Sequence, residues 1–378
     1  MTIKNITVLG SGIMGHGIAQ VSAMAGYKVF LRDIEQVFLD KAMEKIKWSL
    51  RKLAEKNKIT DENADTIYNN ITPIVDLRTA TSNTDLIIEA VPEDFKLKQK
   101  VYSELNELVG NEAIFASNTS TLPITELSKL TRRPQNFIGV HFFNPPQLMK
   151  LVEVIPGTGT DKQVVEELTK YVHSLNKHPV ICKKDVSGFI VNRIFIPLVH
   201  EALFSLDRDK VSMDVVDSAV KFKLDFPMGI FELADYTGLD VIYKASYEMN
   251  LRDKHVLLMH PRVKELYDSN QLGQKTGKGF YEYKDKNYER INLTPEKASQ
   301  YEPLSILGVA ANNAAWLVEN GVCTLDDLNI ALKLGMGIKT EIFELIKKLS
   351  PSKVLGRLKV LEEQENFYHP NQFLEKIR

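Results

Sequence analysis

The residues with the clearest chemical pattern lie near the N-terminus. Gly10-Ser11-Gly12-Ile13-Met14-Gly15 matches GxGxxG, and Asp33 follows at about the 20-residue separation of dinucleotide-binding turns. Gly10 permits a tight turn, Gly12 lets backbone amides approach a pyrophosphate, and Gly15 lets the next helix pack closely. Because Asp33 can bind ribose hydroxyls and would repel a 2′-phosphate, the pattern predicts NAD as cofactor. The alternative is a glycine-rich turn without a ligand.

A second candidate surface is the basic segment 37–58, which has the pattern of a long helix. Between Lys41 and Lys58 it carries seven basic residues and two acidic ones. A helix with this charge is a reasonable docking face for a ligand that bears phosphate groups. A solvated helix face without a ligand is the alternative.

The elements that would position these residues alternate between strands and helices. Helices are expected at 13–25 and 37–58, and strands at 6–9, 28–31, 86–90, 113–117, 137–140, 151–155 and 179–182. Such alternation predicts an α/β fold, a Rossmann-type doubly wound domain over 1–184 with a mostly parallel sheet.

After Asp185 the pattern becomes helical. We expect two all-α domains, at 185–286 and 300–378, with one strand at 279–283, a buried helix at 303–318 and a polar link over 285–303. Ile230-Phe231-Glu232-Leu233 recurs unchanged at Ile342-Phe343-Glu344-Leu345, an offset of 112 residues. Ala219–Phe222 and Ala331–Leu334 match at the same offset, so the second domain is predicted to be a degenerate repeat of the first.

The bulk composition is that of a globular protein without a strong charge bias. The net charge is -1, from 48 basic and 49 acidic residues, which gives no global attraction to nucleic acid or to an anionic membrane. Cys182 and Cys323 have no metal-site spacing, and His255 and His260 lie on different helix faces, so no metal is expected. No signal peptide is apparent, and we expect a cytoplasmic protein with reduced thiols.

Several segments together resemble the 3-hydroxyacyl-CoA dehydrogenase family over about residues 1–284. They are Gly10–Ala19 (GSGIMGHGIA), Ser117–Ser120 (SNTS), His141–Pro146 (HFFNPP), Gly188–Arg193 (GFIVNR) and Lys275–Tyr281 (KTGKGFY). The resemblance implies NAD-dependent oxidation of an (S)-3-hydroxyacyl-CoA, with a short chain such as 3-hydroxybutyryl, to the 3-oxoacyl-CoA, as in fatty-acid β-oxidation.

The same resemblance assigns roles to catalytic residues. His141 matches the family's general base and Glu153 the carboxylate that orients it, a pairing that fits proton removal from a hydroxyl group. Ser120 and Asn192 match polar residues at the substrate's reacting end. Ser120 is assigned instead of Ser117 because it has the right spacing to His141. The alternatives are a core histidine for His141, an ordinary exposed strand residue for Glu153, and capping or structural residues for Ser120 and Asn192.

Other positions match residues that bind the cofactor or coenzyme A. Glu93, Lys98, Asn144 and Lys275 correspond to family positions near NAD, with Ser120 shared between cofactor and substrate. Ser49 and Lys56 correspond to positions that contact coenzyme A. Solvated surface charge is the alternative for Glu93 and Lys98.

Single-function members of the family usually end near residue 285 of this chain, which adds the degenerate second copy of the helical unit from about Pro303. Two stacked copies of the helical unit would bury the face that a partner subunit otherwise covers. We therefore expect an intramolecular pseudo-dimer that is monomeric or weakly dimeric, with hydration left to a separate enoyl-CoA hydratase. Two other functions stay open, a dehydrogenase of a free sugar or hydroxy acid, and a non-catalytic NAD-binding protein.

Overall fold

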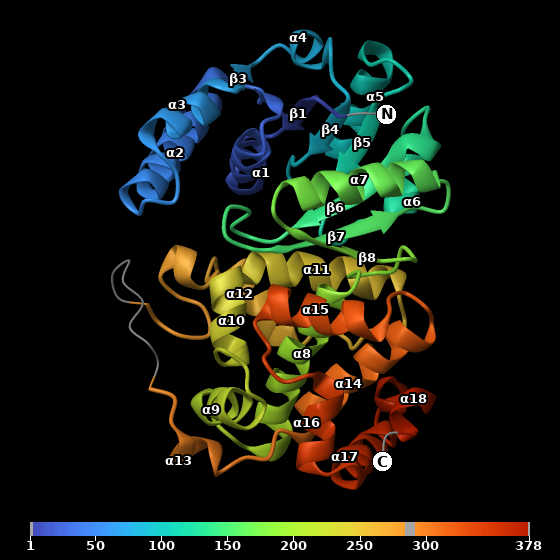
Figure 1. Ribbon diagram of the computed structural model, residues 1–378. Coiled ribbons are helices and arrows are strands. Elements are labelled where there is room, and N and C mark those ends of the chain that lie inside the picture. The colour runs from blue at the N-terminus through green and yellow to red at the C-terminus, as the bar shows by residue number, and fades with distance from the viewer. Residues whose placement is uncertain (1–2, 284–291, 377–378) are drawn as a thin grey trace. The chain divides into compact units, whose positions relative to one another are not determined.

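The computed structural model describes residues 3–283 and 292–376, and the chain divides into two compact units, Met1–Val186 and Ser187–Arg378. The first unit contains one eight-stranded sheet in the order β3-β2-β1-β4-β5-β6-β7-β8 (Figure 1). Its strands are β1 (Asn5–Leu9), β2 (Lys28–Arg32), β3 (Ile71–Ile74), β4 (Leu86–Glu89), β5 (Ile114–Ser117), β6 (Phe137–Phe142), β7 (Leu151–Pro156) and β8 (His178–Ile181). Neighbouring strands are parallel except β6 and β7, which are antiparallel.

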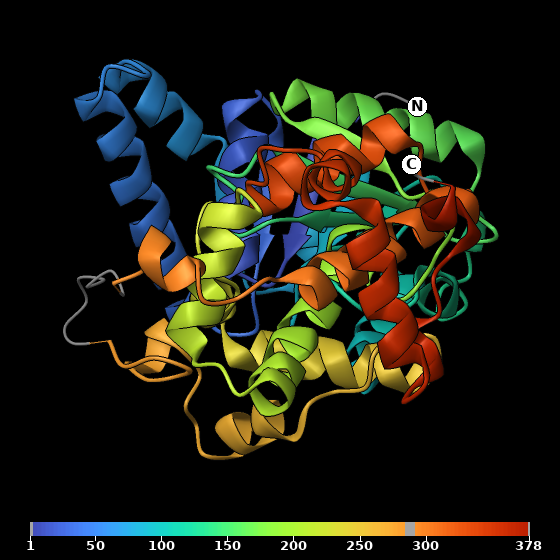
Figure 2. The same cartoon turned by 90° about the horizontal axis from the view of Figure 1, so that it is seen from below.

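Helices cover both faces of this sheet, as expected for a doubly wound fold. On one face α1 (Ile13–Met24), α2 (Gln36–Glu55), α3 (Asp61–Asn69) and α7 (Lys162–Ser174) share a core with alternate strand residues. On the other face α5 (Phe95–Leu108) packs Tyr102 against Phe115 and Phe137. Short helices α4 (Leu77–Thr81) and α6 (Ile124–Ser128) complete the unit. The helices α2 and α3 lie side by side in both views (Figures 1 and 2).

The seven strands expected in this unit are confirmed, with two differences nearby. The strand β3 was not predicted, because it has four residues and contains Pro73, which is tolerated at its edge position. The basic helix ends at Glu55 rather than at residue 58, and Asn57 has a left-handed φ of 53° that stops it.

The second unit is helical. Its longer helices are α8 (Val191–Asp209), α9 (Met213–Lys223), α10 (Ile230–Thr237), α11 (Leu239–Arg252), α12 (Pro261–Asp268), α14 (Leu304–Glu319), α15 (Leu325–Met336), α16 (Ile342–Leu349) and α17 (Pro351–Glu362). Short helices are α13 (Pro295–Ala298) and α18 (Gln372–Glu375), with single turns η2 (Gln274–Thr276) and η3 (Asn366–Tyr368). The helix α14 is mostly buried, as expected for 303–318.

The helix positions repeat along the second unit. The starts of α9, α10 and α11 at Met213, Ile230 and Leu239 recur in α15, α16 and α17 at the same 112-residue offset as the sequence match. The division into helical domains at 185–286 and 300–378 stays a prediction, since residues 187–378 form one compact unit. Parts of that division, and of the expected link over 285–303, lie outside the described residues.

The expected strand at 279–283 is wrong. This segment forms isolated bridges of Lys278 with Gly273 and Glu282 instead of a strand. Its amides at Phe280 and Tyr281 donate to the buried carboxylate of Asp235, each over 2.9 Å. The alternating aromatic residues therefore belong to a segment that packs on α10. The sequence pattern of such a segment is the same as that of a strand in a sheet.

Candidate functional site

The dinucleotide turn follows β1 at the carboxyl edge of the sheet. Gly10 has φ +93°, and a Cβ there would lie 2.6 Å from the Ala90 carbonyl oxygen. A Cβ on Gly15 would lie 1.7 Å from the Gly10 oxygen, so the turn and α1 are in close contact. A Cβ on Gly12 meets no atom of the described residues within 4 Å. The two flanking glycines are needed for packing, whereas Gly12 leaves open space beside the start of α1, as a pyrophosphate requires.

Asp33 lies directly after β2 and is tied to this turn. Its Oδ2 accepts hydrogen bonds from the backbone N (2.6 Å) and the Oγ (2.7 Å) of Ser11, and its Oδ1 accepts from the Ile34 N (2.7 Å). Ile13 is 64% exposed at the start of α1, and Met14 is half-buried. The carboxylate, the open glycine and an exposed apolar side chain therefore lie along one edge, which fits the ribose and phosphates of a dinucleotide.

His141 and Glu153 form a hydrogen-bonded pair across the antiparallel strands β6 and β7. The register places them directly opposite each other, and His141 Nδ1 lies 2.6 Å from Glu153 Oε2. His141 is 7% exposed and Glu153 is fully buried. Because an ionised carboxylate can only accept, this contact favours a proton on Nδ1, and in the neutral ring Nε2 then keeps its lone pair. This tautomer is the one that can remove a proton from a substrate hydroxyl.

The residues after β5 connect the histidine strand to a buried carboxylate. Asn118 Oδ1 accepts a hydrogen bond from the Phe142 N (2.9 Å), which joins this loop to β6. The backbone N of Ser120 donates to Glu93 Oε1 over 3.1 Å, and the Thr119 hydroxyl donates to the same oxygen. Ser117 instead donates its hydroxyl to Glu89 over 2.7 Å. The loop that carries Ser120 is thus held by Glu93.

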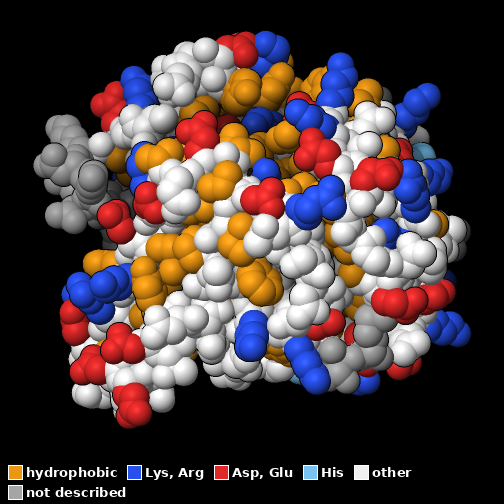
Figure 3. Space-filling view, turned by 90° about the horizontal axis from the view of Figure 1, so that it is seen from above, with side chains coloured by type: hydrophobic (Ala, Val, Ile, Leu, Met, Phe, Trp, Pro, Cys, Tyr) orange, Lys and Arg blue, Asp and Glu red, His pale blue; other side chains and the backbone are white. Residues whose placement is uncertain are grey.

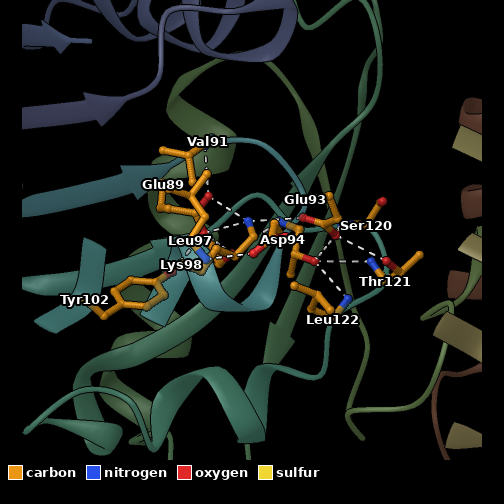
Figure 4. A network of polar contacts seen from close by, with 12 residues as sticks. Glu89, Val91, Glu93, Asp94, Leu97, Lys98, Tyr102, Ser120, Thr121 and Leu122 are labelled. Atoms are coloured by element: carbon orange, nitrogen blue, oxygen red, sulfur yellow. Dashed lines mark hydrogen bonds and ion pairs between the residues drawn. The ribbon is translucent and has the colours of Figure 1, made fainter. Parts of the chain in front are cut away.

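Glu93 and Lys98 belong to a buried charge network (Figure 4). Lys98 is 1% exposed, and its Nζ lies 2.7 Å from Glu89 Oε1 and 3.1 Å from Glu93 Oε2. Burial alone would raise the pKa of Glu93, but Lys98 and the Thr119 hydroxyl hold it below its ordinary value. Solvated surface charge is therefore the wrong description of Glu93 and Lys98.

Glu89 is the member of this network that sequence reasoning missed. It is the last residue of β4, within the predicted strand 86–90, and is fully buried. An acidic residue that ends an apolar run is a usable signal, because buried carboxylates are rare unless they are paired.

The other expected residues are spread over the two units. In the first unit Asn144 is exposed between β6 and β7, Lys56 is exposed at the end of α2, and Ser49 Oγ accepts from Gln20 Nε2 over 3.0 Å. In the second unit Asn192 is the second residue of α8, and Lys275 on η2 pairs with Asp240. These positions are consistent with binding roles but do not by themselves assign any.

Other kinds of site were searched over the described ranges 3–283 and 292–376. They contain no group of three or more His, Cys, Asp or Glu residues arranged to hold a metal ion. None of their helices has the length and apolar character needed to span a membrane. Both cysteines are buried thiols. On the face shown in Figure 3, acidic and basic side chains are interspersed rather than separated by sign.

Comparison with known families and curated proteins gives matches over most of the chain. The NAD-binding domain of 3-hydroxyacyl-CoA dehydrogenase matches residues 5–186, and the C-terminal domain of the same enzyme matches 188–283. The mitochondrial hydroxyacyl-coenzyme A dehydrogenase of Sus scrofa is 41% identical over 290 residues, which are 75% of this chain and 92% of the relative. A probable 3-hydroxybutyryl-CoA dehydrogenase of Deinococcus radiodurans is 38% identical over 279 residues, which are 73% of this chain and 99% of the relative.

Solved structures extend the likeness to the second helical copy. The 3-hydroxybutyryl-CoA dehydrogenase of Escherichia coli shares the fold over 100% of this chain and 98% of its own, with a TM-score of 0.88 and 24% identity. The (S)-3-hydroxybutyryl-CoA dehydrogenase of Ralstonia eutropha, 33% identical, covers 75% of this chain and 100% of its own with a TM-score of 0.71.

The three glycines of the turn predict different responses to alanine. Gly12→Ala should keep the wild-type melting temperature, since the new methyl meets open space, but weaken NAD binding about tenfold or more by blocking the pyrophosphate. Gly15→Ala, the matched control, should destabilise the unit because of its contact with Gly10. Calorimetric titration with NAD and thermal unfolding measure both effects. Wild-type NAD affinity in Gly12→Ala would mean that the cofactor does not approach this turn.

Proposed function

The chain belongs to the 3-hydroxyacyl-CoA dehydrogenase family and is an NAD-dependent enzyme of that class, and we propose that its reaction is carried by the His141–Glu153 pair. The substrate is an (S)-3-hydroxyacyl-CoA, which is oxidised to the 3-oxoacyl-CoA. We propose a short acyl chain, such as 3-hydroxybutyryl, because similar bacterial proteins are 3-hydroxybutyryl-CoA dehydrogenases. The single observation that supports the catalytic assignment best is the 2.6 Å contact between the two side chains.

His141 acts as the general base. Its Nε2 accepts the proton of the C3 hydroxyl as the C3–H bond breaks, and the carbonyl double bond forms between C3 and that oxygen. NAD, when bound, supplies the acceptor for the hydride from C3. The imidazolium that results is stabilised by the buried carboxylate of Glu153, which also fixes the ring orientation before the reaction.

Ser120 and Asn192 are proposed to hold the hydroxyl and the thioester carbonyl of the substrate. Ser120 is suited to this role because its backbone is anchored to Glu93 and its loop is joined to β6 through Asn118. A fixed polar group orients the C–H bond and lowers the entropic cost of reaction.

NAD is proposed to bind along the carboxyl edge of the sheet. Gly10, Gly12, Ile13, Met14 and Gly15 would hold the pyrophosphate, and Asp33 the adenosine ribose. Glu93, Ser120, Asn144 and Lys275 are proposed near the rest of the cofactor. Lys98, whose ammonium is enclosed by two carboxylates, would act through Glu93 rather than by direct contact.

Coenzyme A is proposed to dock on α2. Ser49 and Lys56 are seven residues apart, which places them two turns apart on one side of the helix. Lys45 and Lys52 lie four residues before and three residues after Ser49, so they belong to the same side of α2. A row of ammonium groups beside a hydroxyl is suited to phosphate binding.

The second helical copy is proposed to replace a partner subunit, so that the protein is monomeric or weakly dimeric. The corresponding helices α8 and α14 pack against each other. The corresponding loops also touch, since Thr340 Oγ1 donates to Asp225 Oδ2 over 2.9 Å. We also propose a cytoplasmic location with reduced cysteines, and hydration of the enoyl precursor by a separate enoyl-CoA hydratase.

Replacing the base tests the mechanism. His141→Gln keeps a side chain of similar size but cannot take the proton, so kcat/KM should fall about 10²–10⁴-fold. NAD binding, measured by calorimetry, should stay at the wild-type value because His141 is not part of the glycine turn. Near-normal turnover of this variant would exclude His141 as the base.

Substrate choice separates the proposed activity from a free hydroxy-acid or sugar dehydrogenase. NADH formation should be fast with 3-hydroxybutyryl-CoA and at least about tenfold slower in kcat/KM with 3-hydroxybutyrate, which lacks the phosphates that α2 would bind. A chain-length series of thioesters with NAD and NADP completes the assay. Equal rates with acid and thioester would favour the alternative, and no NADH with either would favour a non-catalytic protein.

Light scattering tests the pseudo-dimer. A mass near the 42.9 kDa of one chain is expected at micromolar concentration, because the repeat already covers α8. A tight homodimer assembled through residues 190–284 would contradict this proposal.

A further inference from the structure

Glu89 accepts hydrogen bonds at both carboxylate oxygens from residues on three different segments of the chain. Its Oε1 accepts from the Val91 N (3.0 Å) and Lys98 Nζ (2.7 Å). Its Oε2 accepts from Lys98 Nζ (2.8 Å), the Tyr102 hydroxyl (2.9 Å) and the Ser117 hydroxyl (2.7 Å). Figure 4 shows Lys98 between Glu89 and Glu93. We call Glu89, Glu93 and Lys98 the buried charge cluster.

The buried charge cluster carries a net charge of -1. All five hydrogen bonds to Glu89 are donated by its partners, two of them from the Lys98 ammonium, which is the arrangement of a carboxylate that only accepts. Glu93 is ionised as well, since its pKa is held below the ordinary value. Burial acts to lower the pKa of Lys98, but Glu89 and Glu93 together raise it, so the ammonium stays charged. Within the described part of the chain, Lys98 is the one cation that pairs with either carboxylate.

The cluster lies at a defined place along the cofactor edge. The strand order places β1 between β2, which is followed directly by Asp33, and β4, which ends at Glu89. The pyrophosphate belongs at the turn after β1, and the adenosine ribose at Asp33. The nicotinamide half of the dinucleotide must then extend to the opposite side, over the ends of β4 and β5. This is where the buried charge cluster lies.

We propose that the buried charge cluster makes the enzyme discriminate between the two oxidation states of its cofactor, because it stabilises bound NAD⁺ but not bound NADH. The Kd for NAD⁺ divided by the Kd for NADH is therefore smaller than it would be with an uncharged cluster. The nicotinamide ring is cationic in NAD⁺ and neutral in NADH, so a nearby net negative charge stabilises only the oxidised ring. Glu89 and Lys98 are buried and the Glu93 side chain is 21% exposed, so solvent screens the charge of the cluster only in part. The inference rests on the proposed NAD site and assigns Glu89 a role that the reaction itself does not require.

The test is the ratio of the dissociation constants of NAD⁺ and NADH, measured by calorimetric titration of the full chain. Glu89→Gln keeps the side-chain shape but leaves the cluster neutral. Its Kd for NAD⁺ divided by its Kd for NADH should rise roughly threefold to tenfold over the wild type, because the net negative charge that attracts the cationic ring is removed. Tyr102→Phe is the matched control, because it removes one hydrogen bond to Glu89 without changing any charge, and its ratio should equal the wild-type ratio.

The outcomes separate the inference from the proposed function. If both constants change by the same factor in Glu89→Gln, the cluster is only structural and the inference is wrong. A shifted ratio in Tyr102→Phe as large as in Glu89→Gln would also contradict it. If circular dichroism shows that Glu89→Gln does not fold, Glu93→Gln removes the same charge and should shift the ratio in the same direction. A wild-type protein that binds neither nucleotide would instead overturn the proposed function.

Discussion

The pairing of β6 with β7 is the constraint on which the proposed chemistry depends. It is the one antiparallel contact in an otherwise parallel sheet, and its register places His141 opposite Glu153. Neighbouring strand residues Val140 and Val154 belong to the core on the other face of the sheet. A slip of one residue would turn the imidazole into that core. Hydrophobic packing on one face therefore fixes the geometry of the base on the other.

Buried charge is the second recurring feature of the first unit. Glu153 and Glu89 are both fully enclosed, which is costly unless donors surround each carboxylate. In the proposed mechanism Glu153 meets an imidazole that changes charge during catalysis, whereas Glu89 meets a lysine that stays charged. One carboxylate would thus serve proton transfer, and the other would set a fixed local potential. Both lie on strands rather than loops, which keeps their positions rigid.

Sequence reasoning predicted the local features better than the distant contacts. The turn from Gly10 to Gly15 and its strand are local patterns, and the structure contains both. The strand β3 was not predicted because Pro73 interrupts a very short apolar run. The segment 279–283 was wrongly predicted to be a strand because its alternating aromatic residues pack against Asp235. The role of Glu89 depends on partners on α5 and β5, and no periodicity within β4 can reveal them. The catalytic pair was found through a family resemblance, since the register that joins its residues is a tertiary property.

The most direct test of the central claim is the tautomer of His141 in the resting protein. Nitrogen-15 NMR of histidine-labelled protein, with the His141 signals assigned from their loss in His141→Gln, reports which ring nitrogen carries the proton. The account predicts the neutral form with the proton on Nδ1, donated to Glu153, and an unprotonated Nε2. A proton on Nε2 with a bare Nδ1 would contradict it, because that ring could not take a proton from the substrate hydroxyl while bonded to Glu153.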